Sequence, residues 1–154
     1  MDALNINSGI AEIFERVARV SQRPAIVGIY GHQNAGKTHL SKLCFNEAHN
    51  RGLRASRGNV ENARSYLCGG AIRISLSLPN PLDSQRSAPD VCFVEDYIIP
   101  FKNDSVEHTG KPMDIIVVIR NYNVCHPGNR VSIEWHIARG DYDLIIDNSD
   151  SVRK

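Results

Sequence analysis

The chain has 154 residues, of which 42% are hydrophobic and 23% charged, and its formal net charge at pH 7 is +1. This length suits one hydrophobic core, so we predict a single domain over residues 1–154. The near-neutral charge gives no basic footprint for nucleic acid, and the apolar runs are shorter than the roughly 20 residues of a membrane helix. We therefore expect neither nucleic acid nor a membrane as a partner.

The N-terminal segment predicts an amphipathic helix. Apolar residues follow Ser8 and Gly9 at helical spacing: Ile10, Ile13, Phe14, Val17 and Val20. The start of the chain carries Asp2 and Glu12 where a secretory signal would have a basic region and an apolar block. We accordingly expect a cytoplasmic location.

The next segment contains the most informative motif of the chain. A β-branched apolar run over residues 25–30 predicts a strand, and at Gly31 the sequence continues as GHQNAGKT. This is a complete phosphate-binding loop, G-x-x-x-x-G-K-[ST], between that strand and a helix predicted over residues 37–50. The pattern predicts a site for ATP or GTP with Mg²⁺.

Each part of the loop has a predicted role. Gly31 and Gly36 permit the tight turn, Lys37 would place its ammonium on the β- and γ-phosphates, and Thr38 would offer its hydroxyl to Mg²⁺. The following helix would direct the positive end of its dipole at the anion. The predicted nucleotide-binding residues are consecutive: Gly31, His32, Gln33, Asn34, Ala35, Gly36, Lys37, Thr38 and His39.

The middle of the chain predicts shorter elements. Residues 53–56 indicate a short second strand, and residues 60–67 a short helix. Residues 71–78 alternate apolar with polar, which indicates a strand with one wet face. Residues 79–89 are rich in Pro, Ser, Asp and Asn and predict a surface loop.

Three further segments, residues 90–96, 115–120 and 143–147, contain uninterrupted apolar runs, which are typical of parallel strands buried on both faces. Residues 131–138 fit both a strand and a helix. We predict a helix, with Trp135 in the core, because consecutive parallel strands need a crossover connection. Strands that alternate with helices in this way predict a three-layer α/β/α sandwich around a parallel sheet.

Two acids close the run at residues 90–96. Glu95 follows four apolar residues, and we predict that it is the carboxylate that acts with Thr38 at the metal. Asp96 is a candidate base for the proton of an acceptor hydroxyl. For both acids, capping of a helix or loop is the alternative role.

An arginine near the γ-phosphate would neutralise charge that develops during phosphoryl transfer, and Arg120, Arg130 and Arg139 are candidates, each of which could instead be a surface residue. The cysteines are scattered without a C-x-x-C pair, so we interpret them as buried or free thiols. We predict no metal beyond nucleotide-bound Mg²⁺.

After the N-terminal helix, four segments together resemble the uridine kinase and phosphoribulokinase group of P-loop kinases: RPAIVGIYGHQNAGKTHLSKL, PDVCFVEDY, MDIIVVIR and RGDYDLIIDNS. The resemblance implies the P-loop NTPase fold with strand order 2-3-1-4-5. It also implies transfer of the γ-phosphoryl group of ATP, with Mg²⁺, to a hydroxyl of a nucleoside or sugar-type small molecule. By position, Lys37 and Thr38 match the triphosphate and Mg²⁺ residues, Glu95 matches the acid that closes the third strand, and Arg130 or Arg139 falls near the lid arginines.

The sequence departs from that group at three places. Residues 53–60 lack the acid-aromatic motif that binds the acceptor, Asp96 replaces the usual Gly, and the connection from Arg120 to Val131 is short for a hinged lid. These gaps favour an alternative, a non-catalytic nucleotide-binding module that acts as a regulator or assembly partner.

Two classes of GTP-binding protein are further alternatives. The loop followed by RGLRAS resembles the GTP-binding accessory proteins of molybdenum cofactor assembly. A GTPase switch is disfavoured, because residues 95–98 and 121–124 provide neither D-x-x-G nor N-K-x-D. The acceptor substrate and a homodimeric state stay open.

Overall fold

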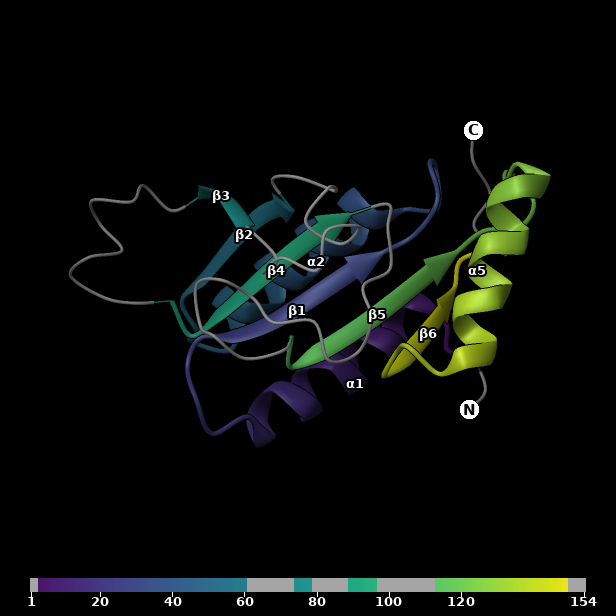
Figure 1. Cartoon of the computed structure of the whole chain (residues 1–154). Helices are drawn as coiled ribbons and strands as arrows, with labels where there is room; N and C mark the ends of the chain where they lie inside the picture. The colour runs from purple at the N-terminus through teal and green to yellow at the C-terminus, as the bar shows by residue number, and fades with distance from the viewer. Residues whose placement is uncertain (1–2, 61–73, 79–88, 97–112, 150–154) are drawn as a thin grey trace.

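A computed structural model describes residues 3–60, 74–78, 89–96 and 113–149 (Figure 1). The strands are β1 (Ala25–Tyr30), β2 (Ala55–Val60), β3 (Ile74–Leu78), β4 (Val91–Asp96), β5 (Ile115–Arg120) and β6 (Leu144–Asp147). The helices are α1 (Ile6–Arg19), α2 (Lys37–Asn50) and α5 (Pro127–Arg139). Within these ranges, no helix combines the length and apolar character that a membrane crossing requires.

The strands form one sheet in the order β3-β2-β4-β1-β5-β6. Five of them are parallel, and counted along the chain they run 2-3-1-4-5, which confirms the predicted order. The strand β3 pairs with β2 in the antiparallel sense at the edge of the sheet. Residues 74–78, the described part of the strand predicted over residues 71–78, therefore add an antiparallel edge strand to the five parallel strands.

The sheet is covered on both faces, as predicted. One hydrophobic core lies between the sheet and the helices α1 and α2, and includes Phe14, Leu40 and Phe93. The second lies on the opposite face, where α5 contributes Ile133. In Figure 1, α5 stands beside β6 at the right, while α1 and α2 lie behind and below the sheet. The three-layer α/β/α architecture is confirmed.

The N-terminal helix begins earlier than predicted. Its N-cap is Asn5, whose side chain accepts a hydrogen bond from the Ser8 amide at 2.8 Å, so Ser8 and Gly9 lie inside the helix. Gly9 is buried because α1 approaches β6 closely, and a Cβ there would lie 2.6 Å from Ile146 Cγ1. The glycine that we interpreted as part of a helix start is a helix–sheet contact.

Two more predictions need correction, and others lie outside the described residues. The second strand spans 55–60 rather than 53–56, so Val60 ends a strand and does not begin a helix. Residues 61–67 of that predicted helix, residues 71–73 and the loop at 79–88 are not described.

Trp135 is not a core residue, since it is 52% exposed. The helix prediction for this segment is confirmed, but α5 buries Ile133 and packs Ile137 against the core. Val131 and Trp135 form a second apolar stripe at the same i, i+4 spacing on the solvent side. Because the two stripes have the same spacing, the sequence alone does not show which of them is buried.

The contact between Gly9 and Ile146 yields a stability prediction. Gly9→Ala should lower the free energy of unfolding by about 1–3 kcal/mol, because overpacking at a helix–sheet contact outweighs the helical preference of Ala. Urea unfolding followed by circular dichroism measures the change. In the double variant Gly9→Ala/Ile146→Ala, which removes both Cγ1 and Cδ1 of residue 146, the cost should be smaller than the sum of the two single changes. Simple additivity would contradict the contact.

Candidate nucleotide-binding site

The phosphate-binding loop leaves the carboxyl end of β1, which lies between β4 and β5 in the sheet. All six residues of β1 are buried, so the chain first reaches the surface at the loop. In open parallel sheets, ligands bind beyond the carboxyl ends of the strands, at the place where the strand order changes direction. The loop occupies that place, at the edge where β4, β5 and β6 also end.

The loop backbone is built as an anion-binding turn. Asn34 and Gly36 have positive φ angles of 68° and 107°, and the Ala35 amide donates to the His32 carbonyl at 3.1 Å. A Cβ on Gly31 would collide with the backbone carbonyl of Ile119. Only glycine therefore fits the start of the loop, where the backbone passes close to β5.

The N-terminus of α2 supplies donors to the loop. Gly36 is the N-cap, and no side chain caps the helix. The first N–H groups of an α-helix have no acceptor within the helix, so those at the start of α2 can donate to a ligand. Together with the helix dipole, these groups make a site suited to phosphate.

Lys37 lies over this turn. Its ammonium donates to the carbonyls of Gly31 at 2.8 Å and His32 at 3.0 Å, and the residue is only 9% exposed. Two carbonyl dipoles thus hold a cation at the mouth of the loop. A phosphate oxygen attracts the ammonium more strongly than a carbonyl does, because it carries negative charge in addition to its lone pairs.

The predicted metal-binding residues Thr38 and Glu95 are in contact. The Thr38 hydroxyl donates to Glu95 Oε1 at 2.8 Å. Neighbouring ligands in a Mg²⁺ octahedron lie about 3.0 Å apart, given metal–oxygen distances of about 2.1 Å, so the two oxygens are close to the separation of a shared magnesium shell. Among the described residues, no three His, Cys, Asp or Glu side chains gather as metal ligands. Phosphate oxygens and water would have to supply the remaining positions.

Arg57 was missed by the sequence analysis. This β2 residue donates through Nη2 to Glu95 Oε2 at 3.2 Å and through Nε to the Ser41 hydroxyl at 2.9 Å. Arg57 lies just beyond the strand predicted over residues 53–56, and no motif marked it. The register that pairs Arg57 with Phe93, two residues before Glu95, is a tertiary feature that no local pattern shows.

The loop is anchored to β5 and β6 by neutral side chains. Asn148 donates through Nδ2 to the Ala35 carbonyl at 3.1 Å. His32 is 4% exposed, and its Nε2 accepts from the Asn121 amide at 3.0 Å, which leaves the proton on Nδ1 to be donated to the Gln33 carbonyl at 2.7 Å. The His32 ring is therefore directed into the protein, and the backbone of His32 forms part of the turn.

Asp96 and Arg130 are the other two predicted catalytic residues. Asp96 ends β4 opposite Tyr30, and its side chain is outside the described structure. Arg130 stacks over the Tyr122 ring at 4.4 Å, with Arg120 over the same ring at 5.1 Å. The catalytic roles of Asp96 and Arg130 stay predictions.

The described cysteines have no features of a nucleophile. Burial raises the pKa of the Cys44 thiol to about 12, with the charge of Glu47 adding to the rise. Burial also raises the pKa of Cys125, although the nearby Arg130 opposes it. Raised pKa values disfavour the thiolate, the reactive form.

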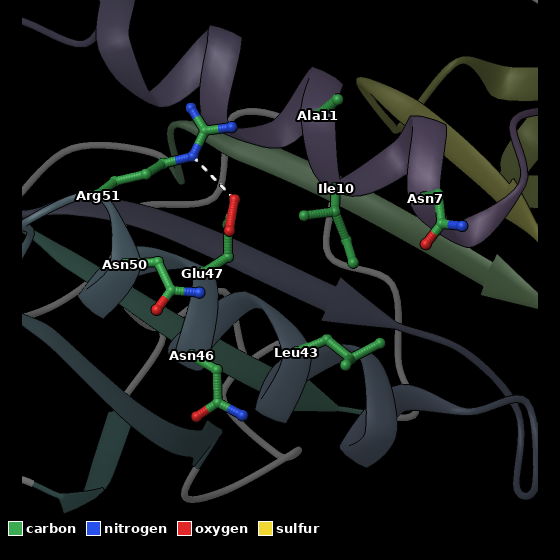
Figure 2. A pocket seen from close by; sticks show the side chains of 8 residues that line it. All are labelled: Asn7, Ile10, Ala11, Leu43, Asn46, Glu47, Asn50 and Arg51. Carbon is green, nitrogen blue, oxygen red and sulfur yellow. Dashed lines mark hydrogen bonds and ion pairs between the residues drawn. The ribbon is translucent and has the colours of Figure 1, made fainter.

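Two hollows occur near these elements. A small one of about 160 Å³ adjoins the loop and is lined by His32, Gln33, Asn129, Ser132 and Ile133. A larger groove of about 380 Å³ lies between α1 and α2, lined by Asn7, Ile10, Ala11, Leu43, Asn46, Glu47, Asn50 and Arg51. Figure 2 shows Ile10 and Leu43 projecting into the space between the helices, with the Arg51–Glu47 ion pair at one end. No loop residue lines this groove, so it is separate from the nucleotide site.

Comparisons with known proteins support the fold. No protein family and no curated protein matches the sequence. Among solved structures, a possible uridine kinase from Bacillus stearothermophilus is similar, with a TM-score of 0.51 and 11% sequence identity over 92% of this chain and 99% of that chain. At this identity the likeness shows the fold alone, a P-loop kinase-like α/β fold.

The ion pair between Arg120 and Asp147, at the ends of β5 and β6, predicts how the stability of the fold depends on pH. Burial works to raise the pKa of Asp147, but hydrogen bonds from Ser149 and Arg120, together with the charge of Arg120, outweigh it and hold the pKa below its usual value. Because the pKa of this carboxyl is lower in the folded state than in the unfolded state (about 3.9), its ionised form stabilises the fold at pH values above the unfolded pKa. This stabilisation is lost as the pH falls through the folded-state pKa. Asp147→Asn should therefore cost about 0.5–1 kcal/mol at pH 7 and less at pH 3.

Urea unfolding at both pH values measures this difference. Glu15→Gln is the control, because its ion pair with Arg19 on α1 is more exposed and should contribute little at either pH. An Asp147→Asn cost that is equal at pH 7 and pH 3 would contradict the assignment.

Proposed function

We propose that the protein binds ATP with Mg²⁺ at residues 31–38 and transfers the γ-phosphoryl group to a hydroxyl of a nucleoside or sugar-type small molecule. The observation that carries the proposal is the convergence of three groups on one loop. These are the Lys37 ammonium over the loop carbonyls, the Thr38 hydroxyl against Glu95, and the uncapped N-terminus of α2. Each serves a different part of a magnesium nucleotide.

The chain's own residues would bind and orient the nucleotide. Lys37 would exchange its two carbonyl acceptors for oxygens of the β- and γ-phosphates, and amides at the start of α2 would donate to the remaining phosphate oxygens. Thr38 and Glu95 would hold Mg²⁺, which when bound neutralises charge on the phosphates. Asp96 would accept the proton of the acceptor hydroxyl, and Arg130 would act near the γ-phosphate.

A second function is favoured by a specific observation on β2. In the kinase group that the sequence resembles, an acid after the second strand activates the acceptor. Here β2 reads ASRGNV, so the strand itself holds no carboxylate and Arg57 turns to Glu95. The first acid after the strand, Glu61, lies outside the described residues. The alternative is therefore a nucleotide-binding regulatory or assembly module without turnover, which could use GTP in place of ATP.

The experiment compares wild type with Lys37→Ala. We expect micromolar ATP or GTP binding in the presence of MgCl₂ by the wild type, and at least about 100-fold weaker binding by the variant, since a charge-assisted contact to the triphosphate is lost. Isothermal titration calorimetry measures both. Lys42→Ala, an exposed lysine of the same helix, is the matched control and should bind as the wild type does.

Product analysis then separates the two functions. Incubation with ATP, MgCl₂ and a panel of nucleosides and sugars should give a phosphorylated product that Lys37→Ala does not form. Lys37-dependent binding without any product would favour the non-catalytic module. Wild-type protein that binds no nucleotide would overturn both.

A further inference from the structure

Beside the phosphate-binding loop, three hydrogen bonds join four side chains from three elements into a ring that the backbone of α2 closes. The Glu95 carboxylate accepts from Thr38 at one oxygen and from Arg57 at the other. Arg57 in turn donates to Ser41, which lies in the same helix as Thr38. Both Glu95 oxygens are thus engaged, and the guanidinium occupies the side of the carboxylate away from the proposed metal position.

The backbone explains why these groups meet. Thr38 and Ser41 are three residues apart on α2, so they lie on one face of the helix. On the sheet, Arg57 pairs with Phe93, and Asn59 pairs with Glu95. Because side chains alternate between the two faces of a strand, Arg57 and Glu95 project to the same face as Phe93, toward α2. Arg57 then needs only the length of its own side chain to reach the carboxylate.

Burial restricts this ring to few conformations. The side chains of Arg57 and Glu95 are 19% and 11% exposed, and Ser41 is fully buried. A guanidinium that donates from Nε and Nη2 to two different acceptors is fixed in its plane as well as in its position, which a lysine ammonium cannot reproduce. The contacts determine which way the Glu95 carboxylate turns.

We propose that Arg57 is a positioning residue of the magnesium site, which holds the Glu95 carboxylate toward the Thr38 hydroxyl through the Ser41-anchored guanidinium. This inference rests on the proposed function, since it assumes that residues 31–38 bind a magnesium nucleotide. The competing role is direct contact of Arg57 with phosphate. The two roles differ in what they predict without metal, because a positioning residue acts only when Mg²⁺ is bound.

The test measures how much Mg²⁺ strengthens nucleotide binding. The quantity is the ratio of the ATP dissociation constant in EDTA to that in excess MgCl₂, obtained by calorimetry. Arg57→Gln should lower this ratio about 10-fold or more, as is typical when a partner of a metal ligand is removed, and leave the EDTA value unchanged. The ratio for Arg57→Lys should lie between the ratios for Arg57→Gln and the wild type.

A double variant shows whether Arg57 acts through Glu95. Glu95→Gln should lower the same ratio, and Arg57→Gln/Glu95→Gln should lower it no further than Glu95→Gln alone. Arg54→Gln is the matched control, because the Arg54 side chain is 58% exposed and its ion pair is with Asp90. Thermal unfolding verifies that each variant is folded. If Arg57→Gln does not fold, Ser41→Ala removes the anchor alone and should lower the ratio by a smaller factor.

The outcomes distinguish this inference from the proposed function. Equal weakening of ATP binding with and without Mg²⁺ would overturn the positioning role in favour of phosphate contact. An unchanged ratio in the Arg57 or Ser41 variants, with wild-type binding intact, would overturn this inference alone. Absence of nucleotide binding by the wild type would overturn the proposed function and this inference together.

Discussion

The burial of β1 on both faces and both edges is the constraint on which the candidate site depends. The strand is flanked by β4 and β5 and covered by the helices of both layers, so the backbone can turn only at its carboxyl end. There Gly31 passes close to the Ile119 carbonyl, and Gly36 adopts a positive φ before α2 begins. The same packing that builds the core therefore places the loop and the start of α2 at one point.

The residues around the loop serve two different ends. His32 and Asn148 bind the loop to the ends of β5 and β6 through neutral hydrogen bonds, so they fix its shape without adding charge. Lys37, Glu95 and Arg57 are the charged groups, and they gather on the side toward α2 and β2. Lys37 lies over the loop and Glu95 is paired with Arg57, and the neutral anchors add no further charge beside them. This division supports a nucleotide over a neutral ligand.

The position of Arg57 bears on whether the protein catalyses a reaction. In the kinase group that the sequence resembles, an acid after the second strand serves the acceptor, whereas Arg57 within β2 is an ion-pair partner of Glu95. If Glu95 depends on Arg57 for its orientation, the second strand serves the metal and not the acceptor. The acceptor would then be bound by another part of the chain, and Asp96 is the remaining candidate for the proton.

The sequence by itself determined the phosphate-binding loop, the roles expected of Lys37 and Thr38, and the order of strands and helices around them. These follow from local spacing, because a loop motif and an apolar period are set by neighbours in the chain. The tertiary structure alone decided which stripe of α5 is buried, that Gly9 is a contact with β6, and that Arg57 faces Glu95. Such features depend on register and packing between segments that are distant in sequence, and no local pattern carries that information.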